Sequence, residues 1–112
     1  MGLDVELLRI EQTGTCPRRR QSVEVAVVAD TGFRFAGAVE RAQHMGSTPM
    51  LDRIDLYGTL ELSSDEMAQL LDELNQMLEA SIDREREVLE AVHRLAVRRR
   101  ADRNLALRFV GD

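Results

Sequence analysis

The most regular hydrophobic pattern of the sequence lies between Ser63 and Leu78. Its apolar positions recur with the spacing of one helical face, and they are Met67, Leu70, Leu71, Leu74, Met77 and Leu78. Ser63 and Glu66 have the spacing of a capping box, in which each side chain binds a free backbone amide at the start of a helix. We therefore predict an amphipathic helix over residues 63–78 whose apolar face packs on another part of the fold.

A second helical pattern begins near Ile82 and ends near Ala96, with an apolar seam of Val88, Val92 and Leu95. The connection over residues 79–83 contains neither glycine nor proline, so two antiparallel helices and one bent helix both fit it. We favour two helices, because a heptad continued from the first pattern would place the polar residues Ser81 and Glu85 on the seam.

Polar residues predict the two ends of the second helix. Ser81 is suited to cap its first turn, and Asp83 and Glu85 add negative charge there. Arg98-Arg99-Arg100 places positive charge in the last turn, where the helix dipole favours cations. Asn104 is predicted to close the helix in a left-handed conformation.

The first third of the sequence alternates with a period near two, which is typical of strands. Val5–Glu11 mixes apolar and charged residues in this way, and Ser22–Ala29 is rich in valine. Asp30-Thr31-Gly32 has the composition of a tight turn, and Phe33 and Phe35, with Gly37, alternate after it. We predict a hairpin here, with strands on both sides of the turn.

The middle of the chain has weaker patterns. Val39–Met45 tolerates a helix but is short, and Met50–Tyr57 fits either a loop or an extended segment. Thr59–Leu62 and Leu105–Val110 each have the composition of a short strand.

Together these elements predict one α+β domain over residues 1–112, with an antiparallel sheet of about four to five strands. An antiparallel helical pair packs on one face of that sheet. A helix over residues 63–78 would be roughly 24 Å long, enough to cross four or five strands at about 4.8 Å spacing. The sheet is therefore the expected partner of its apolar face.

Composition limits the chemistry that the chain can perform. The net charge is −5, and all fifteen basic residues are arginine, so catalysis through a lysine side chain is excluded. The four aromatic residues are few for a surface that stacks nucleic-acid bases. A single cysteine, no signal-peptide pattern and no apolar run of membrane-spanning length favour a cytoplasmic protein.

The candidate catalytic and metal-binding residues form no diagnostic motif. Cys16, His44 and His93 could supply a nucleophile and a base, but no known signature surrounds them. Asp52 and Asp55 lack the spacing of a calcium loop, and the histidines are too far apart for a paired zinc motif. We therefore assign no catalytic residue, metal or cofactor, and an enzyme centred on Cys16 or a histidine is the third hypothesis.

The charge distribution is the most informative feature for function. Residues 61–90 contain ten acidic residues and two arginines, which suggests an acidic helical surface for a basic protein partner. Our first hypothesis is a protein-binding module, of the inhibitor, immunity or regulatory kind, that uses Asp72, Glu73 and Glu79. An open sheet edge would also allow homo-oligomers to form.

The opposite charge dominates the end of the second helix. Residues 94–108 contain six arginines and one aspartate. The second hypothesis is therefore a regulatory protein that binds nucleic-acid phosphates through Arg98, Arg99, Arg100 and Arg103.

Overall fold

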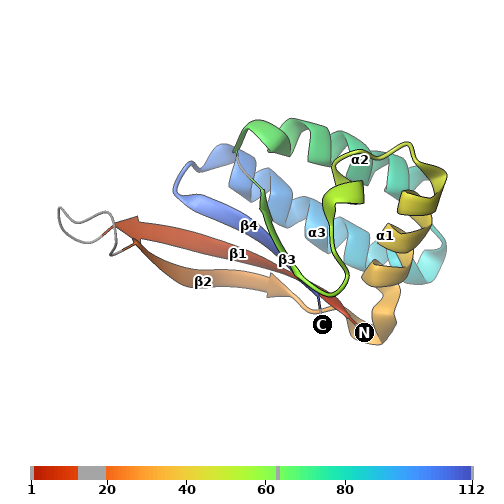
Figure 1. Cartoon of the computed structure of the whole chain (residues 1–112), viewed down its shortest axis with the longest axis horizontal. Helices are drawn as coiled ribbons and strands as arrows, with labels where there is room; N and C mark the ends of the chain where they lie inside the picture. The colour runs from red at the N-terminus through yellow and green to blue at the C-terminus, as the bar shows by residue number, and fades with distance from the viewer. Residues whose placement is uncertain (1, 13–19, 63, 112) are drawn as a thin grey trace.

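The computed structural model describes residues 2–12, 20–62 and 64–111 (Figure 1). In chain order the strands and helices are β1 (Leu3–Gln12), β2 (Arg20–Val28), α1 (Arg34–Met45), β3 (Thr59–Leu62), α2 (Met67–Glu79), α3 (Asp83–Ala101) and β4 (Leu105–Gly111). The described residues between them include the short 3-10 turns η2 (Thr31–Phe33), η3 (Leu51–Arg53) and η4 (Ser64–Glu66). The predicted α+β fold is confirmed.

The four strands form one antiparallel sheet in the order β2-β1-β4-β3. The central strand β1 pairs with β2 on one side and with β4 on the other, so strands from both ends of the chain are neighbours (Figure 1). At the start of β1, Leu3, Val5 and Leu7 are buried while Asp4 between them is exposed, and a register irregularity between Leu7 and Leu8 then shifts the pattern, so that Leu8 is buried as well. This alternation is what turns one face of the sheet toward the core.

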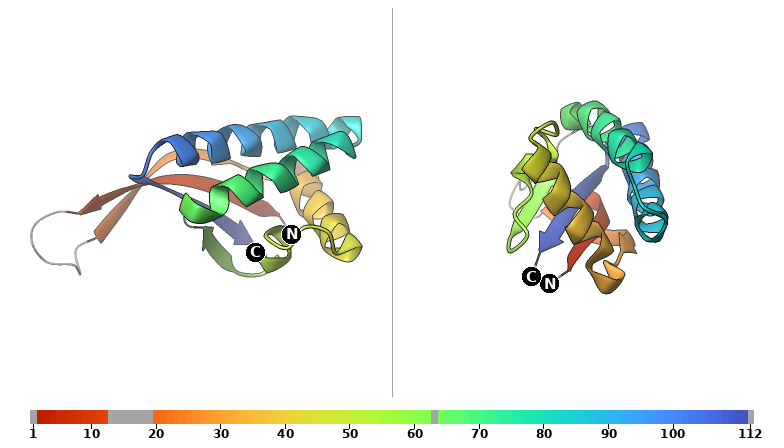
Figure 2. Two further views of the ribbon diagram at one scale, coloured as in Figure 1. Left: turned by 90° about the horizontal axis from the view of Figure 1, so that it is seen from above. Right: turned by 90° about the vertical axis from the view of Figure 1, so that its right-hand side faces the viewer.

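The helices lie on one side of the sheet, as the prediction required. Helices α2 and α3 run side by side in opposite directions, and α1 lies across the end at which they connect (Figures 1 and 2). The core fills the space between helices and sheet, and at its centre the rings of Phe35 and Phe109 stack with 6.3 Å between their centroids.

The two-helix interpretation of residues 63–103 is correct, but Ser81 does not cap α3. The residue before α3 is Ile82, which has an extended backbone and makes no capping hydrogen bond. The Ser81 hydroxyl instead donates to the carbonyl of Leu78 at 2.8 Å, so it closes α2. Asp83 and Glu85 do occupy the first turn of α3.

The end of α3 also differs from the prediction. The cap is Asp102, with extended backbone angles, whereas Asn104 was expected to close the helix in a left-handed conformation. Among the described non-glycine residues, only Phe33 has a positive φ. The Asn104 amide donates to the Asp102 carboxylate at 2.9 Å, a turn that leads directly into β4.

The predicted strand after β2 is wrong, because this segment is α1. Gly32 and Phe33 adopt left-handed backbone angles, with φ of 66° and 59°, and turn the chain away from the sheet. The Asp30 carboxylate then accepts hydrogen bonds from the amides of Phe35 and Ala36 at 2.8 and 2.9 Å. Asp30 therefore satisfies free amides in the first turn of α1. The predicted hairpin would lack these hydrogen bonds.

The helix predicted from residue 63 is present, as α2 after the η4 turn. Ser63 lies outside the described residues, so the capping box is not tested. The segment of uncertain type, Met50–Tyr57, contains η3 followed by a turn in which the Asp55 carboxylate accepts from the amide of Tyr57 at 2.9 Å. Within the described ranges, none of the helices combines the length and apolarity that a membrane span requires.

Candidate functional site

The acidic residues proposed for partner binding do not share one environment. Asp72 and Glu79 are exposed on α2, but Glu73 is completely buried. The expectation that Glu73 points outward is therefore wrong. Asp72 and Glu79 lie seven residues apart on α2 and so share one helical face, and Asp65 is exposed in the η4 turn just before that helix. We call these three residues the acidic ridge.

Glu73 is a structural residue that joins α2 to η3. Its carboxylate accepts hydrogen bonds from the backbone amides of Met50 at 3.0 Å and Leu51 at 2.8 Å. The side-chain amide of Gln69 donates a third bond at 2.7 Å. A buried carboxylate is tolerated when its oxygens are satisfied in this way, and here it meets the free amides at the start of η3.

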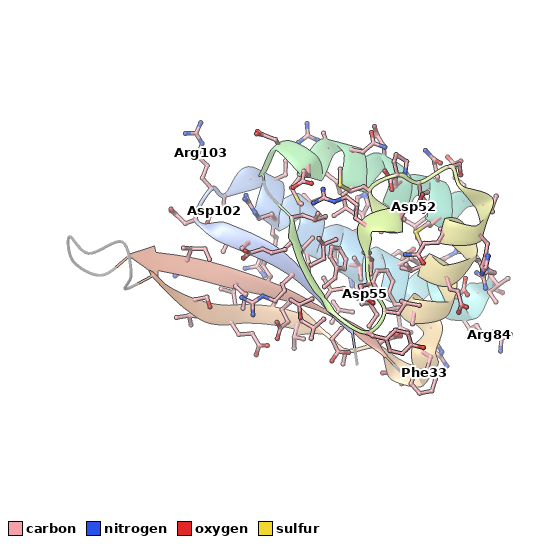
Figure 3. All side chains as sticks on the ribbon, in the orientation of Figure 1. Phe33, Asp52, Asp55, Arg84, Asp102 and Arg103 are labelled. Carbon is pink, nitrogen blue, oxygen red and sulfur yellow. The ribbon has the colours of Figure 1, made fainter. Side chains whose placement is uncertain are left out.

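A second side chain holds the same loop from the other side. The Gln43 amide group on α1 donates to the carbonyls of Leu51 and Ile54, both at 2.9 Å. Glu73 and Gln43 together fix η3 between α1 and α2. Asp52, which η3 carries, is thereby held at the surface (Figure 3).

A pocket of about 470 Å³ lies where α1, α2 and α3 meet. Its surface is largely apolar, and alanine and methionine supply five of its eleven lining residues. The lining residues are Ala38, Arg41, Ala42, His44, Met45, Ser47, Thr48, Gln76, Met77, Ala80 and Glu85. We call this space the helix-junction pocket.

An ion pair of a buried acid and an exposed base lies at the pocket. The Glu85 side chain is 6% exposed, and its Oε1 accepts a hydrogen bond from Nη2 of Arg41, whose side chain is 57% exposed. This bond raises the pKa of the Arg41 guanidinium above its ordinary value, and the charge of Glu85 acts in the same direction. Glu85 is thus held by a cation that lies mostly in solvent.

The arginines proposed for nucleic-acid binding are also divided by burial. Arg98, Arg100 and Arg103 are exposed, and Arg103 extends away from the body of the molecule beyond the end of α3 (Figure 3). Arg99 is only 7% exposed, and one of its terminal nitrogens donates to the carbonyl of Asp102 at 3.4 Å. Arg99 is therefore buried and does not contribute to the predicted basic surface.

The residues of the enzyme hypothesis are not brought into a recognisable site. Cys16 lies outside the described residues, His44 is exposed at the helix-junction pocket, and His93 is half-buried on α3. Among the described residues, no three histidine, cysteine, aspartate or glutamate side chains are grouped so that they could hold a metal ion.

Comparison with protein-family models, with curated proteins and with solved structures finds no match for this chain.

Sequence reasoning missed the helix-junction pocket and the burial of Glu85. A signal for Glu85 exists, because Glu85, Leu89, Val92 and Ala96 follow the spacing of one helical face. The pocket itself has no such signal, since it depends on how three helices meet.

Proposed function

We propose that this protein is a small non-catalytic protein-binding module, of the inhibitor, immunity or regulatory kind, that contacts a basic partner through the acidic ridge. The observation that carries the proposal is the series of exposed carboxylates formed by Asp65 in η4 and by Asp72 and Glu79 on one face of α2, a helix that contains no basic residue. Such a series attracts a complementary basic surface and orients it during encounter.

The stability of the fold does not account for Asp72 and Glu79, the two ridge residues on α2. Among the described residues, neither Asp72 nor Glu79 takes part in an ion pair or a side-chain hydrogen bond. Glu79 is the last residue of α2, where the negative end of the helix dipole disfavours an acidic side chain. Exposed charges that stabilise nothing are available to a partner.

The test is charge reversal on the ridge. A tagged protein with Asp65, Asp72 and Glu79 changed to lysine should fail to capture the partner that the wild-type protein captures from native cytoplasm. The control changes three exposed acidic residues elsewhere, Glu24, Glu40 and Glu61, and carries the same net charge.

Capture of the partner by the control variant but not by the ridge variant supports the proposal. Equal capture by both variants overturns it, since the ridge would then contribute nothing. Equal loss by both variants also overturns it, because net charge alone would then explain the binding.

Nucleic-acid binding is the second candidate, and the exposure of Arg98, Arg100 and Arg103 within six residues favours it. Phosphate contacts through these side chains predict an affinity that falls as salt rises. Changing all three to glutamine should remove binding to a labelled duplex or single strand at low salt. Arg99 stays arginine in this variant, because it is buried. A wild-type protein that binds neither probe at low salt would eliminate this candidate.

A further inference from the structure

The helix-junction pocket has the size and lining of a small-molecule site. Its volume of about 470 Å³ lies within the usual range for ligand pockets. Ala38, Ala42 and Met77 supply buried apolar wall, while Met45 at the rim is 75% exposed. An exposed methionine beside an apolar hollow leaves a surface that an apolar ligand group can cover.

Glu85 gives this pocket a polar group with spare bonding capacity. Its Oε1 is bound by Arg41, but no described residue donates to Oε2. Among the described side chains, the only fully buried polar atom without a hydrogen-bond partner is Nε of Arg99, so Oε2 of Glu85 is open to the pocket or to solvent. An ionised carboxylate accepts several hydrogen bonds, and here most of that capacity is free.

The surroundings favour a cation over an anion beside Glu85. Both α1 and α2 end at the pocket, and the carbonyl ends of helices carry partial negative charge. The positive start of α3 also lies there, but Asp83 and Glu85 already occupy its first turn. Arg41 lies mostly in solvent, so another cation can share or replace its contact with Glu85 at small cost.

We propose that the helix-junction pocket binds a small organic ammonium ion. The apolar body of the ligand packs against Ala38, Ala42 and Met77, and its ammonium group donates to Oε2 of Glu85. This site is separate from the acidic ridge, since none of the ridge residues lines the pocket.

The first experiment compares three head groups on one apolar body in the wild-type protein. Cyclohexylammonium, cyclohexanol and cyclohexanecarboxylate are titrated while the methyl signals of Met45 and Met77 are followed by NMR. We expect saturable shifts at both methyl groups with cyclohexylammonium, and weaker binding of the neutral and anionic compounds. Stronger binding of the carboxylate, or no saturable shift with the ammonium ion, overturns the proposal.

The second experiment removes the charge of Glu85 and keeps its shape. Glu85→Gln should weaken cyclohexylammonium binding by about tenfold, the usual worth of a hydrogen bond to a charged group. Glu90→Gln is the matched control, because Glu90 is exposed on the same helix and outside the pocket. Equal affinities for the two variants would overturn the role of Glu85.

A third variant tests the competition with Arg41. Arg41→Ala removes the resident cation, so cyclohexylammonium should bind this variant several-fold more tightly than it binds the wild-type protein. Unchanged or weaker binding would overturn the proposal, because the carboxylate of Glu85 would then not be the group that attracts the ammonium ion.

Discussion

Two glutamates on neighbouring helices are both buried, but their carboxylates are satisfied in different ways. Glu73 on α2 accepts from two backbone amides and from Gln69, so both of its oxygens are engaged. Glu85 on α3 accepts from a single side chain, that of Arg41, which lies mostly in solvent. The first carboxylate is enclosed by the fold, while the second faces a pocket.

The difference separates a structural acid from one that is available for binding. Backbone amides cannot move away from Glu73 without disrupting η3, so its bonds are permanent while the protein is folded. A long arginine side chain can leave Glu85 by a rotamer change. Burial alone therefore does not distinguish the two roles, whereas the identity of the donors does.

The largest expected effect is at Glu73. Glu73→Leu leaves the buried amide of Leu51 and the part-buried amide of Met50 without an acceptor, which should lower the free energy of unfolding by about 3 kcal/mol in urea denaturation. Gln69→Ala is the control, because it removes one donor and leaves both backbone bonds in place. If the two variants lose the same stability, the backbone bonds of Glu73 are not what makes it structural.

Asp30 extends the comparison to a carboxylate that is only half-buried. It accepts from the amides of Leu3, Phe35 and Ala36 and so joins β1 to the start of α1. Asp30→Ala should lower the free energy of unfolding by about 2 kcal/mol. The measurement is urea denaturation, with Asp30→Asn expected to retain part of the stability. A loss near zero would show that burial, rather than the number of backbone donors, determines the effect.

Glu85→Gln should have a smaller effect on stability than Glu73→Gln. Because Arg41 is largely exposed, their ion pair should contribute no more than about 1 kcal/mol to the free energy of unfolding. Paired denaturation curves of the two glutamine variants test this directly. An equal or larger loss at Glu85 would remove the distinction between the two sites.

The smallest effect is expected on the acidic ridge. Asp72 is exposed, so Asp72→Ala should change the free energy of unfolding by less than about 0.5 kcal/mol. Thermal denaturation of this variant and of the wild-type protein provides the measurement. A clear loss of stability would show that the ridge has a structural role and would weaken the case for a partner there.

Local periodicity was sufficient to predict most of the elements. The strands that became β1, β2, β3 and β4, and the two helices α2 and α3, all follow from apolar spacing over a few residues. The segment that became α1 was assigned wrongly because Asp30-Thr31-Gly32 is compatible with either a hairpin turn or the start of a helix. The choice depends on the bonds that Asp30 makes, and these form only in the folded chain.

The candidate sites were less predictable, for a related reason. Glu73 lies three residues after Leu70 and four before Met77, so its place beside the apolar stripe was visible in the sequence. The donors that make burial acceptable come from Met50 and Leu51, more than twenty residues away. Such distant bonds leave no periodic signal, and a charged residue on a helix is then assigned to the surface.

The strand order also constrains the sequence of events as the chain leaves the ribosome. β1 and β2 are close in the sequence and can pair early, but β3 has only β4 as its neighbour in the sheet. β4 must also complete the second side of β1. The nascent chain therefore exposes the unpaired edges of β1 and β3 throughout synthesis of the whole helical pair, and folding ends with insertion of β4 between them.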